Sequence, residues 1–413
     1  MTRRTCLSLL AATAVAPNIS WSQAGAGGVA LYASVGPVLT HYDVDVAGAT
    51  LNRRDSETLP ANVQYVWPHV SRQYLYAASS NSAPGPGGVV GDKHHVSAFR
   101  LDGPGALTPH GQPIPLPSRP IHLTTDIPSE HVLVAFNNPS ALRVYRINRD
   151  ATLGDEVKQP GAIDAGVFAH QVRVTANNRL AILVTRGNDP TGAKPEDPGA
   201  LKVFHFGNGL LTNAVSVAPD GGYGFGPRHL DFHPSRPWVY VSLERENKLD
   251  LFTLDGDALS ALPRFRKETL ARPDNKLSRQ AAGTVHVHPN GRFVYAANRA
   301  DTTTEFEGKK VFLGGENNIA TYEINQETGE PTLIDHAETH GIHCRTFHID
   351  PGGRLLVAAH IRPLLVKEGT TVRPVPACPS VFRTGNDGKL GFVGLYEVDV
   401  GNDTMFWMGM VPR

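Results

Sequence analysis

One short pattern recurs along the chain: an apolar residue, any residue, an apolar residue and an aromatic residue, with a turn near Asp, Asn or Gly soon after. Such segments have the composition of β-strands bounded by turns. The seven copies are Leu39–Tyr42, Val96–Phe99, Leu142–Tyr145, Leu201–Phe204, Leu249–Phe252, Ile319–Tyr322 and Val393–Tyr396. A strand that returns at this spacing predicts a fold built from repeated β units rather than an irregular domain.

A predicted β-hairpin precedes most copies of this pattern. In the clearest case, the strands 228–233 and 238–243 flank the turn residues Pro234-Ser-Arg-Pro237. Related hairpins span 63–78, 121–136, 171–185, 284–298 and 345–360. Each unit therefore holds about four short strands over roughly 45 to 75 residues, which is typical of a β-propeller blade.

The repeats predict an all-β fold, a single-domain seven-bladed β-propeller over residues 26–413. Because only six hairpins are complete, we expect the ring to close by joining N-terminal strands, such as 29–33, to a C-terminal strand near 405–411. Two consecutive β-sandwiches are the alternative architecture. Four long segments, 79–92, 187–200, 300–316 and 361–389, are predicted as loops on one face of the ring.

The first residues and the overall charge suggest where the protein acts and on what. Residues 1–25 have a basic start and a short apolar run, which is typical of a signal peptide, and Thr2-Arg3-Arg4 resembles a twin-arginine export motif. An ordinary secretory signal is the alternative; either predicts a periplasmic protein without membrane insertion after signal removal. The 39 basic and 39 acidic residues cancel, which argues against nucleic-acid binding. Cys344 and Cys378 are left as either a disulfide or two buried thiols.

Charged residues are expected to meet on one rim of the ring. An antiparallel hairpin returns the chain to its starting edge, so Arg228 and His229 should lie near Glu244. The same geometry brings three further residues to this rim: His170, Arg299 and Arg345. Asn298, which precedes Arg299, is a further candidate for substrate binding.

The chain resembles a known family at these positions, the seven-bladed propeller lactonases that include bacterial 6-phosphogluconolactonase and the fungal 3-carboxy-cis,cis-muconate lactonizing enzyme. The resemblance covers nearly all of the chain after the signal. The segments that carry it are Ala169-His-Gln-Val172, Gly226-Pro-Arg-His229 with Phe232 and Pro234, Val239-Tyr-Val241 before Glu244, and Val294-Tyr-Ala-Ala-Asn-Arg299. It implies that His170, Arg228, Glu244 and Arg299 are the functional residues. The export signal, the polar insertion 301–316 and Ala359-His-Ile361 depart from the family pattern.

Hydrolysis of a lactone requires groups of these types. A base must activate water, positive groups must stabilise the developing oxyanion, and an acid must protonate the leaving alkoxide. Glu244 is the candidate base, His170 donates or relays a proton, and Arg228 and Arg299 bind an anionic substrate. Lactone formation by a cycloisomerase would use the same groups. A non-catalytic propeller that binds an anionic ligand or a protein partner is a further alternative.

Other types of chemistry have weaker signals in this sequence. His286-Val-His288 and His340-Gly-Ile-His343 could supply imidazole ligands to a metal, but no carboxylate cluster accompanies them, so no metal and no other cofactor is expected. His94-His95 is predicted to be solvated in a loop. There is no Gly-x-Ser-x-Gly nucleophile elbow, and no glycine-rich phosphate loop precedes a helix. Oligomeric state and the identity of the lactone are left open.

Overall fold

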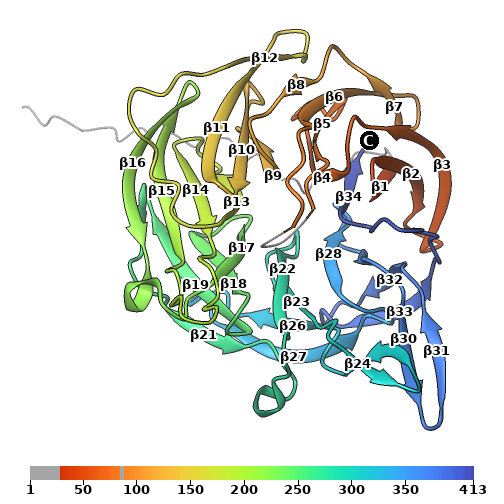
Figure 1. Cartoon of the computed structure of the whole chain (residues 1–413). Coiled ribbons are helices and arrows are strands. Elements are labelled where there is room, and N and C mark those ends of the chain that lie inside the picture. The colour runs from red at the N-terminus through yellow and green to blue at the C-terminus, as the bar shows by residue number, and fades with distance from the viewer. Residues whose placement is uncertain (1–27, 84–87) are drawn as a thin grey trace, which may run out of the picture.

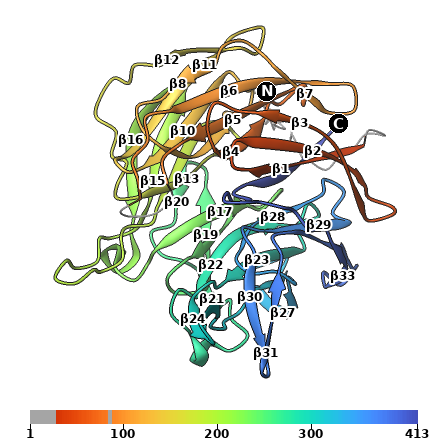
Figure 2. The same ribbon diagram turned by 45° about the vertical axis from the view of Figure 1, so that its right-hand side comes forward.

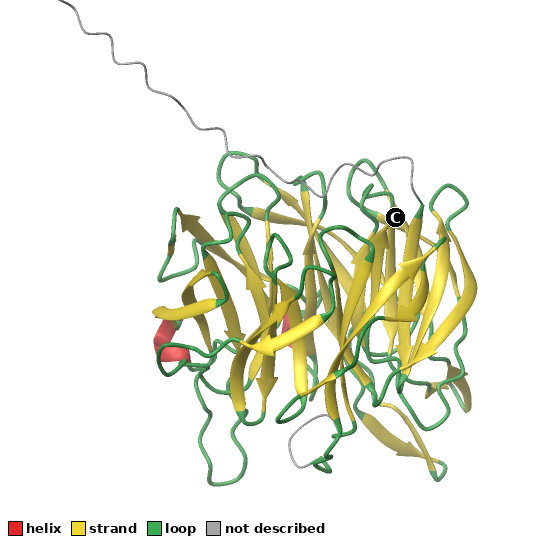
Figure 3. Cartoon of the chain, turned by 90° about the horizontal axis from the view of Figure 1, so that it is seen from above, coloured by secondary structure: helices red, strands yellow, loops and turns green. Residues whose placement is uncertain are grey.

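The computed structural model describes residues 28–83 and 88–413, and these residues form an almost entirely β structure. Seven sheets are arranged around a central axis as the blades of a propeller (Figure 1). Seen from another side, the strands dominate and helical structure is limited to short turns (Figure 3). The predicted seven-bladed propeller is confirmed, and the signal peptide predicted for residues 1–25 lies outside the described residues.

The strands follow one another around the ring. The first three blades contain β1 (Val29–Val35), β2 (Val38–Asp45), β3 (Thr50–Thr58) and β34 (Met408–Pro412); β4 (Val63–Pro68), β5 (Tyr74–Ser80), β6 (His94–Asp102), β7 (Ala106–Pro109) and β8 (Ile114–Pro115); and β9 (Pro120–Thr125), β10 (His131–Asn137), β11 (Ser140–Ile147) and β12 (Leu153–Glu156).

The other four blades contain β13 (Ala169–Val174), β14 (Leu180–Thr185), β15 (Ala200–Gly207) and β16 (Leu210–Val217); β17 (Pro227–Phe232), β18 (Trp238–Leu243), β19 (Lys248–Asp255), β20 (Ala258–Leu259) and β21 (Phe265–Glu268); β22 (Ala281–Val287), β23 (Phe293–Arg299), β26 (Asn318–Ile324) and β27 (Pro331–Glu338); and β28 (Cys344–Ile349), β29 (Leu355–His360), β32 (Pro379–Thr384) and β33 (Leu390–Leu395). Two 3-10 helices, η1 (Pro219–Gly222) and η2 (Pro273–Asn275), lie in loops.

The ring closes as the sequence predicts. β34, the last strand, pairs antiparallel with β1, and their register aligns Leu31 with Met410. The first blade therefore combines three N-terminal strands with one C-terminal strand, so both strands have a partner where an open sheet would expose edges. The residues before β34 join this contact, because the Trp407 N–H donates a hydrogen bond of 3.0 Å to Ser34 Oγ.

Most of the inner strands contain one extra residue near their start. The pairing of β13 with β14, for example, skips from Ala169 to Gln171 and leaves His170 without a cross-strand partner. Such a β-bulge re-aims the side chain of the extra residue. Across five blades the extra residues are Gln64, Ile121, His170, Arg228 and Arg345.

Tyrosines in the second strands connect neighbouring blades. Their hydroxyl groups donate to backbone carbonyls in a turn of the next blade: Tyr32 to Gly105, Tyr76 to Ala151, Tyr240 to Gly329 and Tyr295 to Gly388. All four tyrosines are fully buried. Each buried hydroxyl is thus satisfied across a blade interface, which ties the blades together.

Four insertions connect the second and third strands of their blades on the same face as Glu244. Two of them contain strands rather than loop alone: β24 (Thr303–Phe306) and β25 (Lys309–Phe312), and β30 (Leu364–Glu368) and β31 (Thr371–Val375). These four strands form a separate accessory sheet, in which β25 and β30 run parallel (Figure 2). The last insertion ends before β32 rather than at Lys389, because β32 is a blade strand.

Two local predictions are wrong. The segment Val393–Tyr396 is not the third strand of its blade: it falls at the end of the outermost strand β33, where Val393 is 45% exposed. Val381 and Phe382 of β32 occupy the third-strand position and are buried. His94 is not solvated either. It begins β6, is buried, and its Nδ1 lies 2.8 Å from Ser80 Oγ.

Cys344 and Cys378 are free and buried, which answers the question left open by the sequence. Burial raises the pKa of the Cys344 thiol to about 12 and that of the Cys378 thiol to about 11. Both therefore stay protonated near neutral pH, as expected of thiols that serve as small apolar core groups.

Among the described residues, no helix is long and apolar enough to cross a membrane.

The corrected strand assignment predicts a stability difference between two phenylalanines. Phe382→Ala should lower the free energy of unfolding by about 3–5 kcal/mol, because Phe382 is 1% exposed in the blade core. Phe392→Ala is the matched control, since Phe392 is 43% exposed on β33, and should cost about 1 kcal/mol or less. Urea unfolding of both variants measures the difference, and equal losses would contradict the assignment.

Candidate active site

Glu244 lies at the centre of a group of arginines on the rim of the ring. It directly follows β18, and its N–H donates to the Gly226 carbonyl at the entry of the hairpin. Its Oε2 is 2.7 Å from Arg186 Nε, and its Oε1 is 3.2 Å from Arg228 Nε and also contacts Arg299 Nη2. The predicted meeting of Arg228, Glu244 and Arg299 is therefore present.

This environment makes Glu244 a weak base. Burial opposes ionisation of its carboxyl group, but the positive charges of Arg299, Arg186 and Arg228 outweigh burial and lower the pKa of Glu244 to about 2. A carboxylate with so low a pKa has little tendency to take a proton from water. The geometry instead suits Glu244 to holding three guanidinium groups in fixed positions.

A narrow central cavity opens beside this cluster. Its lining contains all five residues that the β-bulges re-aim, together with His229, Tyr65, Thr346, Phe406 and Trp407. Arg228 joins the two regions, since its Nε faces Glu244 while its side chain also lines the cavity. Neither Glu244 nor Arg299 is part of this lining.

His170 and His229 are neighbouring rings in the cavity, with centroids 5.1 Å apart. Burial and the nearby charge of Arg228 hold the pKa of both imidazoles well below the usual value, so both are neutral near neutral pH. Among the described residues His170 Nδ1 has no hydrogen-bond partner, whereas the His229 ring lies 3.4 Å from Arg228 Nη1. His170 is thus the imidazole with a nitrogen available to a substrate or water.

Arg345 belongs to β28 of the last blade and His170 to β13 of the fourth, but both side chains line the same cavity. Its Nε donates a 3.0 Å hydrogen bond to the Phe406 carbonyl, and its guanidinium carbon lies 3.6 Å from the centre of the Phe406 ring. Burial and the charges of Arg228 and Arg299 lower the pKa of Arg345. The stacking fixes the plane of the guanidinium group and leaves its terminal nitrogens for an anion.

Some residues differ from their predicted place. Asn298 is fully buried, and its Nδ2 donates to Asn318 Oδ1 at 2.8 Å and to a backbone carbonyl, so its side chain belongs to the blade interior rather than to the cavity. Arg186 was not selected from the sequence. The signal was available, because Arg186 follows the second strand of its blade as Glu244 follows β18. Arg119 is a further buried arginine beside Phe406 that the sequence analysis missed.

The histidines considered as metal ligands have separate environments. His288 Nε2 lies 2.8 Å from the Gly353 carbonyl, His286 Nδ1 lies 3.5 Å from Asp231, and His340 packs on the ring of Phe392. His343 Nε2 contacts Arg299 Nη1 at 3.0 Å. The four imidazoles therefore do not form a common ligand set.

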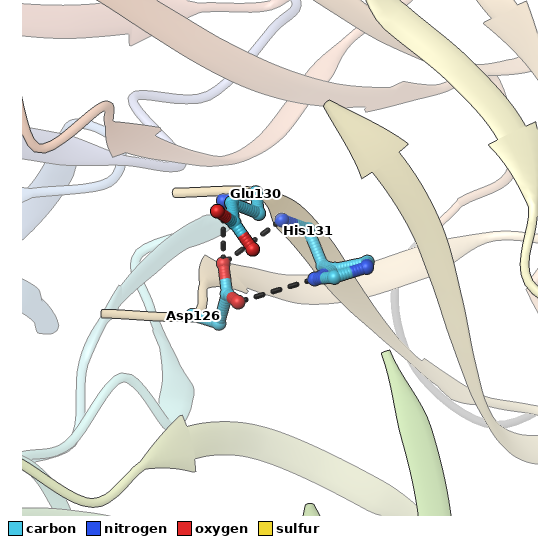
Figure 4. A group of neighbouring side chains, drawn as sticks. All are labelled: Asp126, Glu130 and His131. Carbon is cyan, nitrogen blue, oxygen red and sulfur yellow. Dashed lines mark hydrogen bonds and ion pairs between the residues drawn. The ribbon is translucent and has the colours of Figure 1, made fainter. Parts of the chain in front are cut away.

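Asp126, Glu130 and His131 are grouped closely enough to suggest a metal site, but they form a turn (Figure 4). Asp126 accepts hydrogen bonds of 2.8 Å from the N–H groups of Glu130 and His131, and its other oxygen lies 3.1 Å from His131 Nδ1. Asp350 caps the equivalent turn of the last blade through the N–H groups of Arg354 and Leu355. The recurrence explains the group as turn capping.

Comparisons with known proteins agree with this fold. A 6-phosphogluconolactonase of Bacillus subtilis is 27% identical over 330 residues, covering 77% of this chain and 83% of that protein. One of Serratia proteamaculans is 24% identical over 359 residues, covering 86% of each. The structure of a periplasmic gluconolactonase of Pseudomonas aeruginosa has a TM-score of 0.66 at 17% identity, covering 93% of this chain and 99% of that one, which shows the shared fold.

A family model supplies the most direct evidence. The model described as Lactonase, 7-bladed beta-propeller, matches residues 29–363, which is most of the chain. Of the blade strands, only β32 and β33 of the last blade and β34 of the first lie outside the match. The match includes His170, Arg228, Glu244 and Arg299. This protein therefore belongs to the seven-bladed β-propeller lactonase family.

Proposed function

We propose that the protein hydrolyses a small acidic lactone in the central cavity. The observation that carries this proposal is the convergence of His170, Arg228 and Arg345, each the extra residue of a β-bulge, on one cavity. A neutral imidazole and two guanidinium groups are the parts that water-dependent opening of a lactone requires. Family membership and the 6-phosphogluconolactonase relatives support the same reaction.

In the proposed mechanism His170 is the base. Neutral His170 takes a proton from water as the water oxygen bonds to the lactone carbonyl carbon, and the carbonyl oxygen becomes an oxyanion stabilised by the Arg228 guanidinium. The bond between the carbonyl carbon and the ring oxygen then breaks. The imidazolium of His170 returns the proton to the departing alkoxide, so the product is a hydroxy acid and the enzyme is unchanged.

Glu244 has a different role in this proposal from the one expected from its sequence position. Its two oxygens contact Arg186, Arg228 and Arg299, and its pKa near 2 makes it a poor acceptor for a proton from water. We propose that Glu244 fixes Arg228 in the orientation that the oxyanion needs. Preorganised charge of this kind costs no reorganisation during the reaction.

The proposed substrate carries a negative charge apart from the lactone group. Arg228 and Arg345 both line the cavity, and the neighbouring Arg119 is 7% exposed, with Nε and Nη2 lacking partners among the described residues. Burial alone lowers the pKa of Arg119 to about 10, so it remains charged near neutral pH. Buried positive charge in excess of its counter-ions is best compensated by a carboxylate or phosphate on the substrate.

Hydrolysis across a panel of acidic and neutral lactones, followed in a pH-stat, tests the proposal. We expect turnover with preference for acidic lactones. Arg345→Gln should raise KM for acidic lactones by about 10-fold or more, because it removes a charge-assisted contact, and should leave KM for neutral lactones nearly unchanged. Turnover of no lactone would reject the proposal; rapid lactone formation from an unsaturated acid would instead identify a cycloisomerase.

The role of His170 predicts a loss in kcat. His170→Ala should reduce kcat by about 10²- to 10⁴-fold, the range for a general base, with little change in KM. His205→Ala is the matched control, because His205 is exposed on β15 outside the cavity, and should match the parent protein. Equal activity of the two variants would remove His170 from the mechanism.

The pH profile supplies a second readout for His170. The base form exists above the pKa, which burial and the charge of Arg228 hold well below 6.5. The acid limb of kcat/KM for the parent enzyme should therefore lie well below pH 6.5, and activity should be lost only as the pH falls through that limb. A limb centred near pH 6.5 would contradict a buried, arginine-flanked imidazole as the base.

We propose further that the protein is exported to the periplasm. The basic start, the apolar run and the paired arginines of residues 1–25 support this location. Expression of the full chain in a Gram-negative host should yield a periplasmic form that lacks this segment, and Arg3→Lys with Arg4→Lys should retain the chain in the cytoplasm. N-terminal sequencing of each fraction checks the outcome, and export of the double variant would indicate the ordinary secretory route.

A further inference from the structure

Asp301 is a buried carboxylate that neither the resemblance nor the proposed mechanism uses. It is 5% exposed and lies just after β23, at the start of the insertion that forms β24 and β25. Its Oδ1 is 3.1 Å from Arg279 Nη2, and its Oδ2 is 3.0 Å from Arg362 Nη2. Arg362 stands at the start of the next insertion, so Asp301 connects the bases of both hairpins of the accessory sheet.

His343 links this carboxylate to the arginine cluster. Its Nδ1 lies 3.3 Å from Asp301 Oδ2, and its Nε2 lies 3.0 Å from Arg299 Nη1. A guanidinium group can only donate hydrogen bonds, so Nε2 accepts and the ring proton must be on Nδ1, facing Asp301. The backbone N–H of His343 donates to Asn317 Oδ1 at 2.8 Å, which fixes the backbone of His343 against the end of the insertion.

The charges around His343 keep this arrangement in one protonation state. The charged groups facing it are Asp301, Arg299 and Arg345. Burial, together with the two arginines, outweighs the opposing effect of Asp301 and lowers the pKa of His343 to about 4. The imidazole is thus neutral near neutral pH and can accept from Arg299 while the charge of Asp301 sets its tautomer.

Arg299 is therefore held at both of its terminal nitrogens. Nη1 contacts His343, Nη2 contacts Glu244, and Glu244 in turn contacts Arg228 in the cavity. We propose that Asp301 and His343 are positioning residues, which act through Arg299 and Glu244 to orient Arg228 and couple the accessory sheet to the active site. This inference rests on the proposed function, because it takes from it that the Arg228 guanidinium stabilises the oxyanion.

Two variants at contacting residues distinguish a positioning role from a role in stabilising the fold. Asp301→Asn keeps the size of the side chain, but its amide can donate to His343 Nδ1 and turn the Nε2 proton toward Arg299. Arg362→Gln removes one partner of Asp301 from the exposed side and leaves His343 and Arg299 in contact. Asp301→Asn should lower kcat on the order of 10- to 100-fold with little change in KM, since the oxyanion contact develops only in the transition state.

Arg362→Gln should keep kcat within about 3-fold of the parent, because Arg362 itself is exposed and Asp301 keeps its contacts with Arg279 and His343. Thermal unfolding of both variants confirms that each is folded. Equal kcat losses in the two variants, or a loss confined to KM, would overturn the positioning proposal. His343→Gln should reproduce the kcat loss of Asp301→Asn, and the double variant should lose no more than the single ones.

The tautomer of His343 supplies a readout that does not depend on activity. In protein labelled with ¹⁵N-histidine, the resonances of His343 are those that the parent shows and His343→Gln lacks. In the parent they should report a protonated Nδ1 and an unprotonated Nε2. In Asp301→Asn the two nitrogens should exchange these states. A protonated Nε2 in the parent would overturn the proposal. If the parent hydrolyses no lactone, the proposed function fails by itself, and this spectrum alone decides whether Asp301 and His343 hold Arg299.

Discussion

The one-residue bulge at the start of the inner strands is the constraint on which the rest of this molecule depends. A regular propeller strand alternates its side chains between the two faces of its blade, and neither face looks along the central axis. The extra residue breaks that alternation and turns one side chain per blade inward. Five blades contribute in this way, and the cavity owes its His170, Arg228 and Arg345 to the same local irregularity.

The charge balance at the rim depends on one carboxylate, because Glu244 contacts Arg186, Arg228 and Arg299. Glu244 is shared by three arginines, and its carboxylate is stable only because their charges exceed the cost of burying it. Because three arginines contact one carboxylate, Glu244 is a weak base. Positive charge on Arg228 and Arg345 in the cavity therefore exceeds the negative charge nearby. The proposed anion binding and the proposed stabilisation of the oxyanion would both use this excess of positive charge.

Much of the fold could be predicted from sequence because its signals are local and repeated. The hairpins, the closure by β34 and the rim location of Glu244 follow from strand patterns and antiparallel geometry. The errors occurred where the pattern is ambiguous: Val393–Tyr396 reads as a third strand, and only its exposure on an outer edge shows otherwise. The prediction that Asn298 binds substrate was wrong for a related reason, since a position at the end of a strand does not reveal which way the side chain points. The contact of Asp301 with His343 joins segments about 40 residues apart and has no local signal.

Closure of the ring by the last strand also sets an order in time. Phe406 and Trp407 immediately precede β34, so the segment that completes the first blade is the same segment that walls the cavity. Until the C-terminal segment has been synthesised, β1 lacks its partner β34, and Arg345 lacks the Phe406 ring on which it stacks. The cavity is therefore complete only once the last residues of the chain are in place.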